Sequence, residues 1–327
     1  MAFAVDPDDL LIWLTRSTAE RALVGGKGAS LSQLAALGAP VPAAFALTTR
    51  VYQEFASAIA IPERASQVTD ADLPGIRERI QQAPLPPAIE ALITSGYEAL
   101  RHGQTCSSAV AVRSSATAED SAECSFAGLH DTILDVRDVE TLIGAVKQCW
   151  ASLWSDRAVS YRRAGGFAAD EAAIGVVVQE LVPSDVSFVV FTADPVSNDG
   201  DVLMITASWG LGEAVVSGLV VPDQIVIDVD GLVTDYKIGD KHLMIIPADK
   251  PGQCTREVPV PKALRSLPAL THEQAMDIGR TARSIASQLG YKADIEGAIA
   301  RGSLYILQAR PITTLTRPHG NQVEVNA

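Results

Sequence analysis

Two runs of alternating residues, 293–299 and 304–311, constrain the fold more than any other feature of this sequence. A turn around residues 301–303 separates them, so we expect the runs to fold back on each other as an antiparallel hairpin. With a turn of that length, Glu296 lies roughly opposite Gln308. The pairing predicts that a carboxylate and an amide meet on neighbouring strands.

The two faces of this hairpin differ in polarity. Side chains alternate between the faces of a strand, so Glu296 shares a face with Asp294, and Gln308 shares a face with Arg310. The other face carries apolar residues that can pack against a core: Ile295, Ile299, Leu307 and Ala309.

The polar face has the groups that bind magnesium and phosphate. Glu296 and Gln308 offer hard oxygen ligands, and Mg²⁺ usually takes few protein ligands and fills its shell with water and phosphate oxygens. Arg310 adds a fixed positive charge with a forked set of donors that suits a phosphate. The alternative is an exposed hairpin whose outer face is simply solvated. The hairpin alone does not decide between these interpretations.

Composition limits the size of the fold and the class of partner. The 327 residues are 47% hydrophobic, which is enough for a sizeable core in two lobes. A formal net charge of −13 argues against a nucleic acid or an anionic membrane as the partner. No apolar run approaches the ~18 residues that span a bilayer, and no basic-then-apolar leader opens the chain. The four cysteines show neither CxxC spacing nor the density of a disulfide scaffold, so we expect a cytoplasmic protein.

Helical and strand-like segments both occur along the chain, which predicts an α+β fold. Helices are expected at residues 29–37, 49–59, 87–101, 139–163 and 273–289. Strands are expected at 109–113, 131–136, 174–181, 187–192, 202–207, 224–229 and 232–238. We expect an N-terminal lobe at 1–185, a C-terminal lobe at 186–315 and a tail at 316–327.

Two glycine-rich segments are candidate phosphate-binding turns. Lys27 lies in a glycine-rich turn that opens a helix, where free N–H groups attract anions. The segment is not a P-loop, because Arg21 stands where the first glycine is required. The stretch 210–215 is not a dinucleotide fingerprint, because Val215 takes the place of the third glycine. Either segment can equally be a structural turn.

Arg113 follows an apolar run and leads into small hydroxyl residues at 114–117. Its guanidinium can pair with a phosphate, and the following loop, which continues to Gly128, can close over it. A surface loop with a capping Ser/Thr run is the alternative.

Taken in order, six segments resemble the nucleotide-binding domain of the phosphoenolpyruvate synthase, pyruvate phosphate dikinase and rifampicin phosphotransferase family. They are GGKGASL at 25–31, AVRSSATAED at 111–120, SFAG at 125–128, FTADP at 191–195, WGLGEAVVSG at 209–218 and LQARPIT at 307–313. The match runs over nearly the whole chain. It implies an ATP-grasp fold with the nucleotide held between two lobes.

The resemblance implies contacts with ATP or Mg²⁺ for eight residues. They are Lys27 and Arg113 on the ATP phosphates, Gly128 and Thr132 in the closing loop, Gln179 near the adenine, Glu296 and Gln308 on Mg²⁺, and Arg310 on a phosphate. Arg113 and Arg310 are the expected catalytic residues. Phosphoryl transfer depends mostly on positioning and charge neutralisation, so no protein base is required.

In this family ATP gives its β-phosphate to a histidine on a mobile domain, and AMP and phosphate are released. The phosphohistidine then phosphorylates a third substrate, for which pyruvate, a phenol and an antibiotic remain open. The histidines of this chain lack the family's Gly- and Ser-rich context: His102, His130, His242, His272 and His319. We therefore expect a partner protein with the phosphohistidine and acceptor domains, as in phenylphosphate synthase. The alternatives are a non-catalytic adenine-nucleotide sensor and an ATP-grasp carboxylate ligase, which would release ADP.

Three positions depart from the family pattern. Phe188 stands where a small glycine is usual, and Gly297 follows Glu296 where an aromatic residue is common. Residues 129–130, Leu and His, replace a polar pair. These changes can repack the nucleotide pocket or a docking face, but they remove no expected phosphate or metal ligand.

Overall fold

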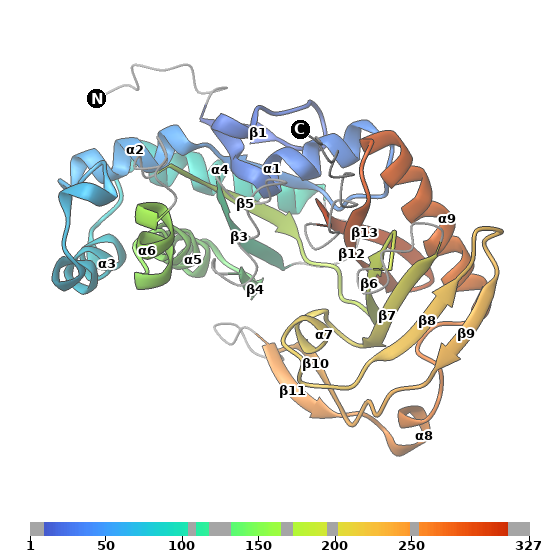
Figure 1. Ribbon diagram of the computed structural model, residues 1–327. Helices are drawn as coiled ribbons and strands as arrows, with labels where there is room; N and C mark the ends of the chain where they lie inside the picture. Colours follow the sequence, from blue (N-terminus) through green and yellow to red (C-terminus); the bar gives the residue numbers. More distant parts are fainter. Residues whose placement is uncertain are drawn as a thin grey trace, which may run out of the picture.

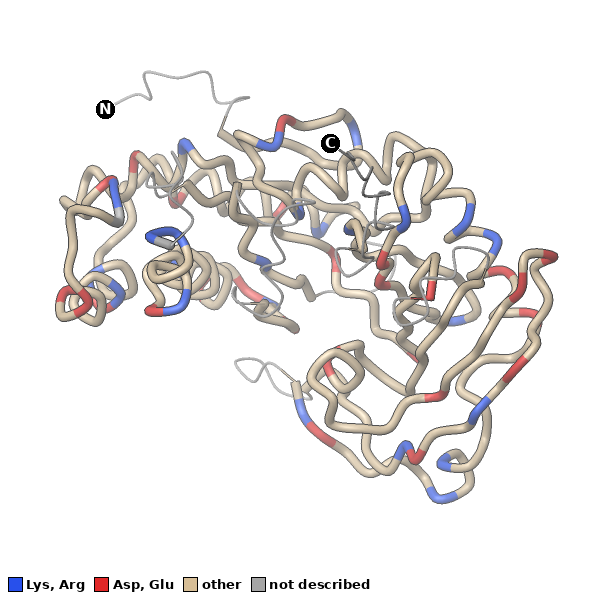
Figure 2. The backbone as a smooth tube through the Cα atoms, in the orientation of Figure 1, with Lys and Arg blue, Asp and Glu red and all other residues tan. Residues whose placement is uncertain are grey.

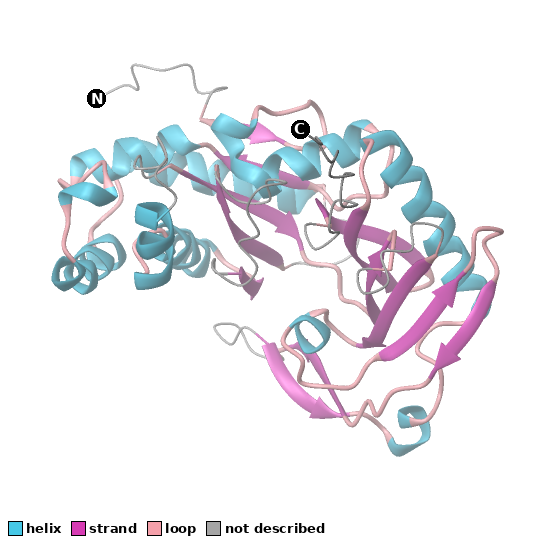
Figure 3. Ribbon diagram, in the orientation of Figure 1, coloured by secondary structure: helices cyan, strands magenta, loops and turns pink. Residues whose placement is uncertain are grey.

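The computed structural model describes residues 10–103, 109–117, 132–164, 173–194, 202–248 and 255–312. They form two large antiparallel sheets with helices packed against them, and one small two-stranded sheet (Figure 1). Helices and strands occur in both halves of the chain (Figure 3). The α+β class and the two-lobed arrangement expected of an ATP-grasp fold are confirmed.

Five strands form the first sheet. Their order is β1 (Leu11–Trp13), β2 (Ala44–Leu47), β5 (Ile174–Glu180), β3 (Val110–Ala116) and β4 (Thr132–Val136). Every residue of β2 and β5 is buried. Strand β2 and the first five residues of β5 are continuous apolar runs, the pattern expected of strands that are covered on both faces, and β5 ends in the buried polar residues Gln179 and Glu180.

Helices and 3₁₀ turns build an aromatic core beside the first sheet. They are α2 (Thr49–Ala58), α3 (Leu73–Gln82), α4 (Pro87–His102), α5 (Val139–Ser152) and α6 (Asp156–Ala164), with 3₁₀ turns at Ala65–Gln67 and Asp70–Asp72. Phe55 stacks on Trp150 with ring centroids 4.8 Å apart. Trp154 Nε1 donates a hydrogen bond of 2.7 Å to the Tyr52 hydroxyl, and burial raises the pKa of Tyr52 to about 12. This packed core supports β3 and β5, which carry Arg113 and Gln179.

Six strands form the second sheet. Their order is β13 (Ser303–Pro311), β12 (Ala293–Ala300), β6 (Val186–Phe191), β7 (Leu203–Trp209), β8 (Asp223–Ile227) and β9 (Val233–Lys237). Helix α9 (His272–Leu289) packs against β7, β8, β9 and β12 (Figure 1). Thr271 and Gln274 form a capping box at its start, and Gly290 ends it in the left-handed conformation. The predicted helix at 273–289 is confirmed.

A small two-stranded sheet and two short helices extend the second lobe. These elements are β10 (Leu243–Pro247), β11 (Thr255–Pro259), α7 (Glu213–Val216) and α8 (Lys262–Arg265). Nearby, Lys241 and Asp223 form a fully buried ion pair. Asp223 also accepts hydrogen bonds from the backbone nitrogens of Gly239 and Ala269, at 2.8 and 2.7 Å. Both charges are therefore compensated inside the protein.

Helix α1 (Arg21–Ala36) joins the two lobes, because it packs against β3, β5 and β13. Ser30 Oγ donates to the carbonyl oxygen of Ala309 at 2.5 Å. Leu34 is fully buried in the core of the second sheet. The chain passes from one sheet to the other between β5 and β6, at residues 181–185. The proposed lobe boundary at residue 185 stays a prediction.

Several predicted elements differ from the structure. The single helix expected at 139–163 is two helices, because Ser155 Oγ accepts from the backbone nitrogen of Ala158 and so caps the start of α6. The helix expected at 29–37 begins earlier, at Arg21. Strands β1, β2, β10 and β11 and helix α3 were not predicted. Within the described ranges, no helix has both the length and the apolar composition needed to cross a membrane.

Candidate functional site

A cavity of about 480 Å³ is lined by residues from both sheets. It brings together seven of the eight residues singled out from the sequence, which are Lys27, Arg113, Thr132, Gln179, Glu296, Gln308 and Arg310. Gly128, the eighth, lies outside the described residues. Acidic and basic residues are interspersed along both lobes (Figure 2), so the cavity is distinguished by its convergent side chains and not by the overall charge.

The hairpin of β12 and β13 confirms the predicted pairing. Glu296 pairs with Gln308, and Asp294 pairs with Arg310. The turn contains two residues, Arg301 and Gly302, both with positive φ, of 51° and 76°. This is the conformation of a type I′ turn, which suits the twist of a two-residue hairpin.

The position of Leu307 differs from the prediction for this hairpin. The register shifts at Glu296/Gly297, where Glu296 pairs with Gln308 but Gly297 pairs with Ile306. Leu307 is therefore the extra residue of a β-bulge. It lies with Tyr305 on the side of Val182 and lines the cavity, so the expectation that it packs on the face of Ile295 was wrong.

Arg113 connects the first sheet to the hairpin of the second. Its Nη2 donates to Oε1 of Gln308 at 2.7 Å and lies 3.4 Å from Oε2 of Glu296. Its Nη1 donates to the carbonyl oxygen of Leu307 at 3.2 Å. The predicted phosphate ligand thus contacts both predicted magnesium ligands, a contact that the sequence did not suggest.

Arg310 is held by Asp294, a residue to which the sequence analysis assigned no separate role. Nε and Nη2 of Arg310 lie 2.9 and 2.8 Å from Oδ2 of Asp294. Since the two residues occupy paired positions on β12 and β13, the alternation of the strands was the signal that could have assigned this role.

The glycine-rich segment before Lys27 packs directly against β3. Gly25 interrupts α1 with φ of 73°, and a Cβ atom there would lie 1.9 Å from the carbonyl oxygen of Ser115. The backbone nitrogen of Gly28 donates to Ser115 Oγ at 3.1 Å. The backbone at Gly25 is not helical, so α1 consists of two helical parts joined by a kink, and the predicted glycine-rich turn opens the second part. Close packing against β3 leaves no room for a side chain at this kink. Lys27 is nearly buried, donates to the carbonyl oxygen of Ser114 at 3.0 Å and lines the cavity.

Gln179 presents a buried amide to the cavity. Its side chain is 2% exposed, and its Nε2 has no hydrogen-bond partner among the described residues. A buried donor without a partner costs about 1–3 kcal/mol, so this amide is suited to an acceptor on a ligand. Thr132 is exposed at the start of β4, where it pairs with Arg113.

The family model described as "Pyruvate phosphate dikinase, AMP/ATP-binding domain" matches residues 21–327. The chain belongs to this family. The probable phosphoenolpyruvate synthase of Pyrococcus horikoshii is 36% identical over 92% of this chain and 43% of its own length. The rifampicin phosphotransferase of Streptomyces sp is 39% identical over 89% of the chain and 34% of its own length. The prodigiosin synthesizing transferase PigC of Serratia marcescens is 37% identical over 92% of the chain and 33% of its own length.

The chain spans less than half the length of these relatives, between 33% and 43%. Among solved structures, the D-alanyl-alanine synthetase A of Vibrio cholerae matches 88% of the chain and 57% of its own, with 11% identity and a TM-score of 0.35. The family assignment therefore rests on the sequence relatives and on the family model. It makes this chain an ATP-binding domain of a family that includes phosphotransferases.

Two departures from the family pattern meet in the structure. Phe188 on β6 pairs with Gly297 on β12, and both line the cavity. A Cβ atom on Gly297 would lie 2.2 Å from Cζ of Phe188. The aromatic ring therefore fills the space that a side chain at 297 would take. The other departure, at residues 129–130, lies outside the described part of the chain.

The donor set of the hairpin fits a magnesium site with few protein ligands. Glu296 and Gln308 place one carboxylate and one amide oxygen at paired strand positions on the cavity. No group of three His, Cys, Asp or Glu residues that could hold a metal is found in the ranges that the structure describes. Phosphate and water oxygens would therefore complete the shell of a magnesium ion bound by Glu296 and Gln308.

The rest of the cavity wall suits an aromatic base. Its apolar residues include Ala111, Leu134, Leu181, Val182, Leu211 and Val215. Ligand pockets typically combine such a wall with a few placed polar groups. Of the described histidines, His102, His242 and His272, none lines this cavity. His130 and His319 lie outside the described residues.

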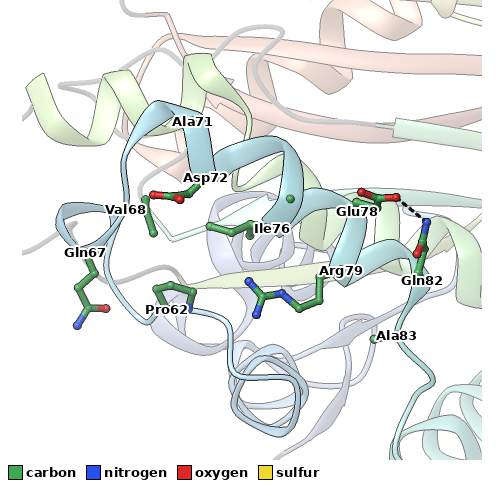
Figure 4. Close-up of a pocket in the computed structure, with 11 residues that line it drawn as sticks. Pro62, Gln67, Val68, Ala71, Asp72, Ile76, Glu78, Arg79, Gln82 and Ala83 are labelled. Atoms are coloured by element: carbon green, nitrogen blue, oxygen red, sulfur yellow. Dashed lines mark hydrogen bonds between the residues drawn. The ribbon is translucent and has the colours of Figure 1, made fainter.

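A second, larger cavity of about 980 Å³ lies beside α3 (Figure 4). Its charged lining residues are Asp72, Glu78 and Arg79. Gln82 donates to Glu78 at 2.9 Å, the contact drawn as a dashed line in Figure 4. Two carboxylates and one guanidinium do not suit a triphosphate, so cavity size does not identify the site.

Proposed function

We propose that this chain binds ATP with Mg²⁺ between its lobes and passes the β-phosphate to a histidine on a partner protein. AMP and phosphate are released, and the phosphohistidine then phosphorylates a small-molecule acceptor. The proposal is carried by the convergence of three cationic side chains on one cavity, together with the magnesium ligands of the hairpin. Those cations are Lys27, Arg113 and Arg310.

In this proposal the triphosphate is held from two sides. Lys27 and Arg113 approach it from the first lobe, and Arg310, held by Asp294, approaches from the second. Magnesium on Glu296 and Gln308 would neutralise phosphate charge during transfer. The reaction needs positioning and charge neutralisation, which these groups supply without a protein base.

The base end of the cavity completes the nucleotide site. The apolar wall and the buried amide of Gln179 would hold the adenine. Thr132, at the start of β4, would contact the nucleotide together with Gly128 of the closing loop. We place the reaction in the cytoplasm, where ATP is abundant. A reducing compartment also agrees with Cys149, which is a buried free thiol.

The accepting histidine is proposed to lie on a swivelling domain of a partner protein that also binds the acceptor. This is supported by the absence of a histidine among the described cavity residues and by the greater length of the relatives. The histidine nitrogen would attack the β-phosphorus, and the bond to the oxygen shared with the α-phosphorus would break, so that AMP leaves. Water would then release the γ-phosphate. Pyruvate, a phenol and an antibiotic are candidate acceptors.

³¹P NMR of ATP with Mg²⁺, the chain and proteins encoded beside its gene tests the proposal. We expect AMP and phosphate to form only when the partner's histidine is intact. ADP as product would indicate a ligase or an ordinary kinase. Tight nucleotide binding without turnover in every mixture would favour a sensor.

A matched pair of variants links this activity to the cavity. Arg310→Met removes a cation from the site, and we expect AMP formation to fall by about 10²–10³-fold. Arg79→Met removes a cation from the second cavity and should leave AMP formation unchanged. Equal effects of the two substitutions would place the chemistry elsewhere.

A further inference from the structure

We propose that Arg113 is an internal counter-cation of the magnesium site, which Mg²⁺ and ATP displace together. This inference rests on the proposed function, because it concerns how the same site takes up its ligands. Arg113 holds the side-chain oxygens of Glu296 and Gln308, and Mg²⁺ gains both ligands only when the guanidinium moves to the ATP phosphates.

Among the described residues, the side-chain hydrogen bonds of Arg113 go to the groups that would bind the metal or to the residue next to them. Nη2 reaches Gln308 Oε1 at 2.7 Å and Glu296 Oε2 at 3.4 Å, and Nη1 reaches the carbonyl oxygen of Leu307 at 3.2 Å. The Arg113 side chain is only 12% exposed. A guanidinium in this position neutralises the Glu296 carboxylate in a partly desolvated cavity.

The β-bulge explains why one side chain can make all these contacts. Leu307 is the extra residue of β13, and its carbonyl oxygen accepts from Arg113 directly before Gln308 in the chain. The bulge therefore presents a backbone acceptor and a side-chain acceptor together to a residue of the other sheet. Bulges commonly re-aim side chains in this way next to functional sites.

A metal ion that arrives alone must compete with this arrangement. Mg²⁺ and the guanidinium would share the oxygens of Glu296 and Gln308, and even an ion on the second oxygen of Glu296 would stand close to a fixed positive charge. ATP favours release of Glu296 and Gln308 by Arg113, because its phosphates offer the guanidinium stronger, charge-assisted hydrogen bonds. Nucleotide and metal should therefore each raise the affinity of the other.

Arg113→Met tests this coupling in the absence of nucleotide. The substitution keeps an apolar stem, removes the charge and releases Glu296 and Gln308. We expect Mn²⁺, followed by electron paramagnetic resonance of the free ion, to bind about tenfold more tightly than to the unsubstituted chain. The gain should disappear in the double variant Arg113→Met/Glu296→Gln.

Lys27→Met is the matched control, since it removes a positive charge from the same cavity and its Nζ donates to the carbonyl oxygen of Ser114. We expect it to raise Mn²⁺ affinity less than Arg113→Met does. Should Arg113→Met fail to fold, as judged by its thermal melt, Arg113→Gln makes the same test with a neutral polar side chain.

Unchanged or weaker Mn²⁺ binding by the folded Arg113 variants would overturn the inference. Isothermal titration of the unsubstituted chain with ATP and Mg²⁺ separates this failure from that of the proposed function. Binding of the nucleotide–metal complex, with no gain in the Arg113 variants, would refute only the counter-cation. Absence of nucleotide binding would refute the proposed function itself.

Discussion

Gly297→Ala tests whether the Phe188 ring occupies the space beside Gly297 at the wall of the cavity. The new Cβ atom would lie 2.2 and 2.6 Å from Cζ and Cε2 of Phe188 and 2.7 Å from the carbonyl oxygen of Tyr305. Phe188 is 2% exposed and belongs to the core of the second sheet, so its ring has little room to move. Overpacking of this kind costs about 1–3 kcal/mol of the free energy of unfolding.

The same substitution should be less costly when the ring is absent. Phe188→Ala alone should lower the free energy of unfolding by about 3–5 kcal/mol, because it leaves a cavity in a packed core. In that background the two shortest contacts of the new Cβ atom are gone and the contact with the Tyr305 carbonyl oxygen remains, so part of the penalty of Gly297→Ala is relieved. We therefore expect a coupling of about 1 kcal/mol or more between the two positions.

Urea unfolding of the parent, the two single variants and the double variant measures this coupling. Gly144→Ala is the matched control, because nothing lies within 4 Å of a Cβ atom at that position of α5. We expect it to be neutral or to stabilise by up to about 1 kcal/mol. Additive effects of Gly297→Ala and Phe188→Ala, within about 0.5 kcal/mol, would refute the argument.

Three further substitutions test other parts of the structure. Gln179→Leu should keep or raise the free energy of unfolding, because it removes a buried amide nitrogen that has no partner among the described residues. Isothermal titration should nevertheless show weaker ATP binding. Lys241→Met should lower the free energy of urea unfolding by about 3–5 kcal/mol, because it leaves the buried Asp223 carboxylate without its counter-charge. The double variant Lys241→Met/Asp223→Asn should recover part of that free energy. Burial raises the pKa of Tyr52 from 10.0 to about 12, so the folded state binds the hydroxyl proton more tightly than the unfolded state does. The free energy of unfolding should therefore fall as the pH rises from 10 to 12, and Tyr52→Phe should reduce that fall.

The register of the hairpin could be predicted because strand alternation and turn length are local properties. Glu296 does face Gln308, and Asp294 does face Arg310. The bulge at Leu307 could not be predicted, because one extra residue in a strand leaves the apolar character of the run unchanged. The face assigned to Leu307 was therefore wrong, whereas those assigned to Gln308 and Arg310 were right.

Helix boundaries were predictable where capping residues mark them. They were not predictable where a helix begins with residues that are typical of turns. Thr271 and Gly290 cap α9, whose observed bounds lie within one residue of the predicted helix at 273–289. Helix α3 was missed because Pro74 and Gly75 suggest a turn, although proline is well tolerated in the first turn of a helix. Strand β2 was missed because four buried apolar residues show no alternation.

Contacts between distant segments were beyond the reach of the sequence. Arg113 is separated from Glu296 by 183 residues, and no local pattern links them. The same holds for Phe188 and Gly297, which the sequence marked as two unrelated departures. Their direct pairing on β6 and β12 places the large side chain opposite the position that has none.

The position of α1 limits how this molecule can be divided. Leu34 lies in the core of the six-stranded sheet, and the backbone nitrogen of Ile306 donates to the carbonyl oxygen of Pro40 at 2.9 Å. A fragment that begins at residue 186 would lose that leucine and leave an apolar surface open to solvent. The two halves, produced separately, should therefore be poorly soluble alone and should recover a folded protein only when they are made together.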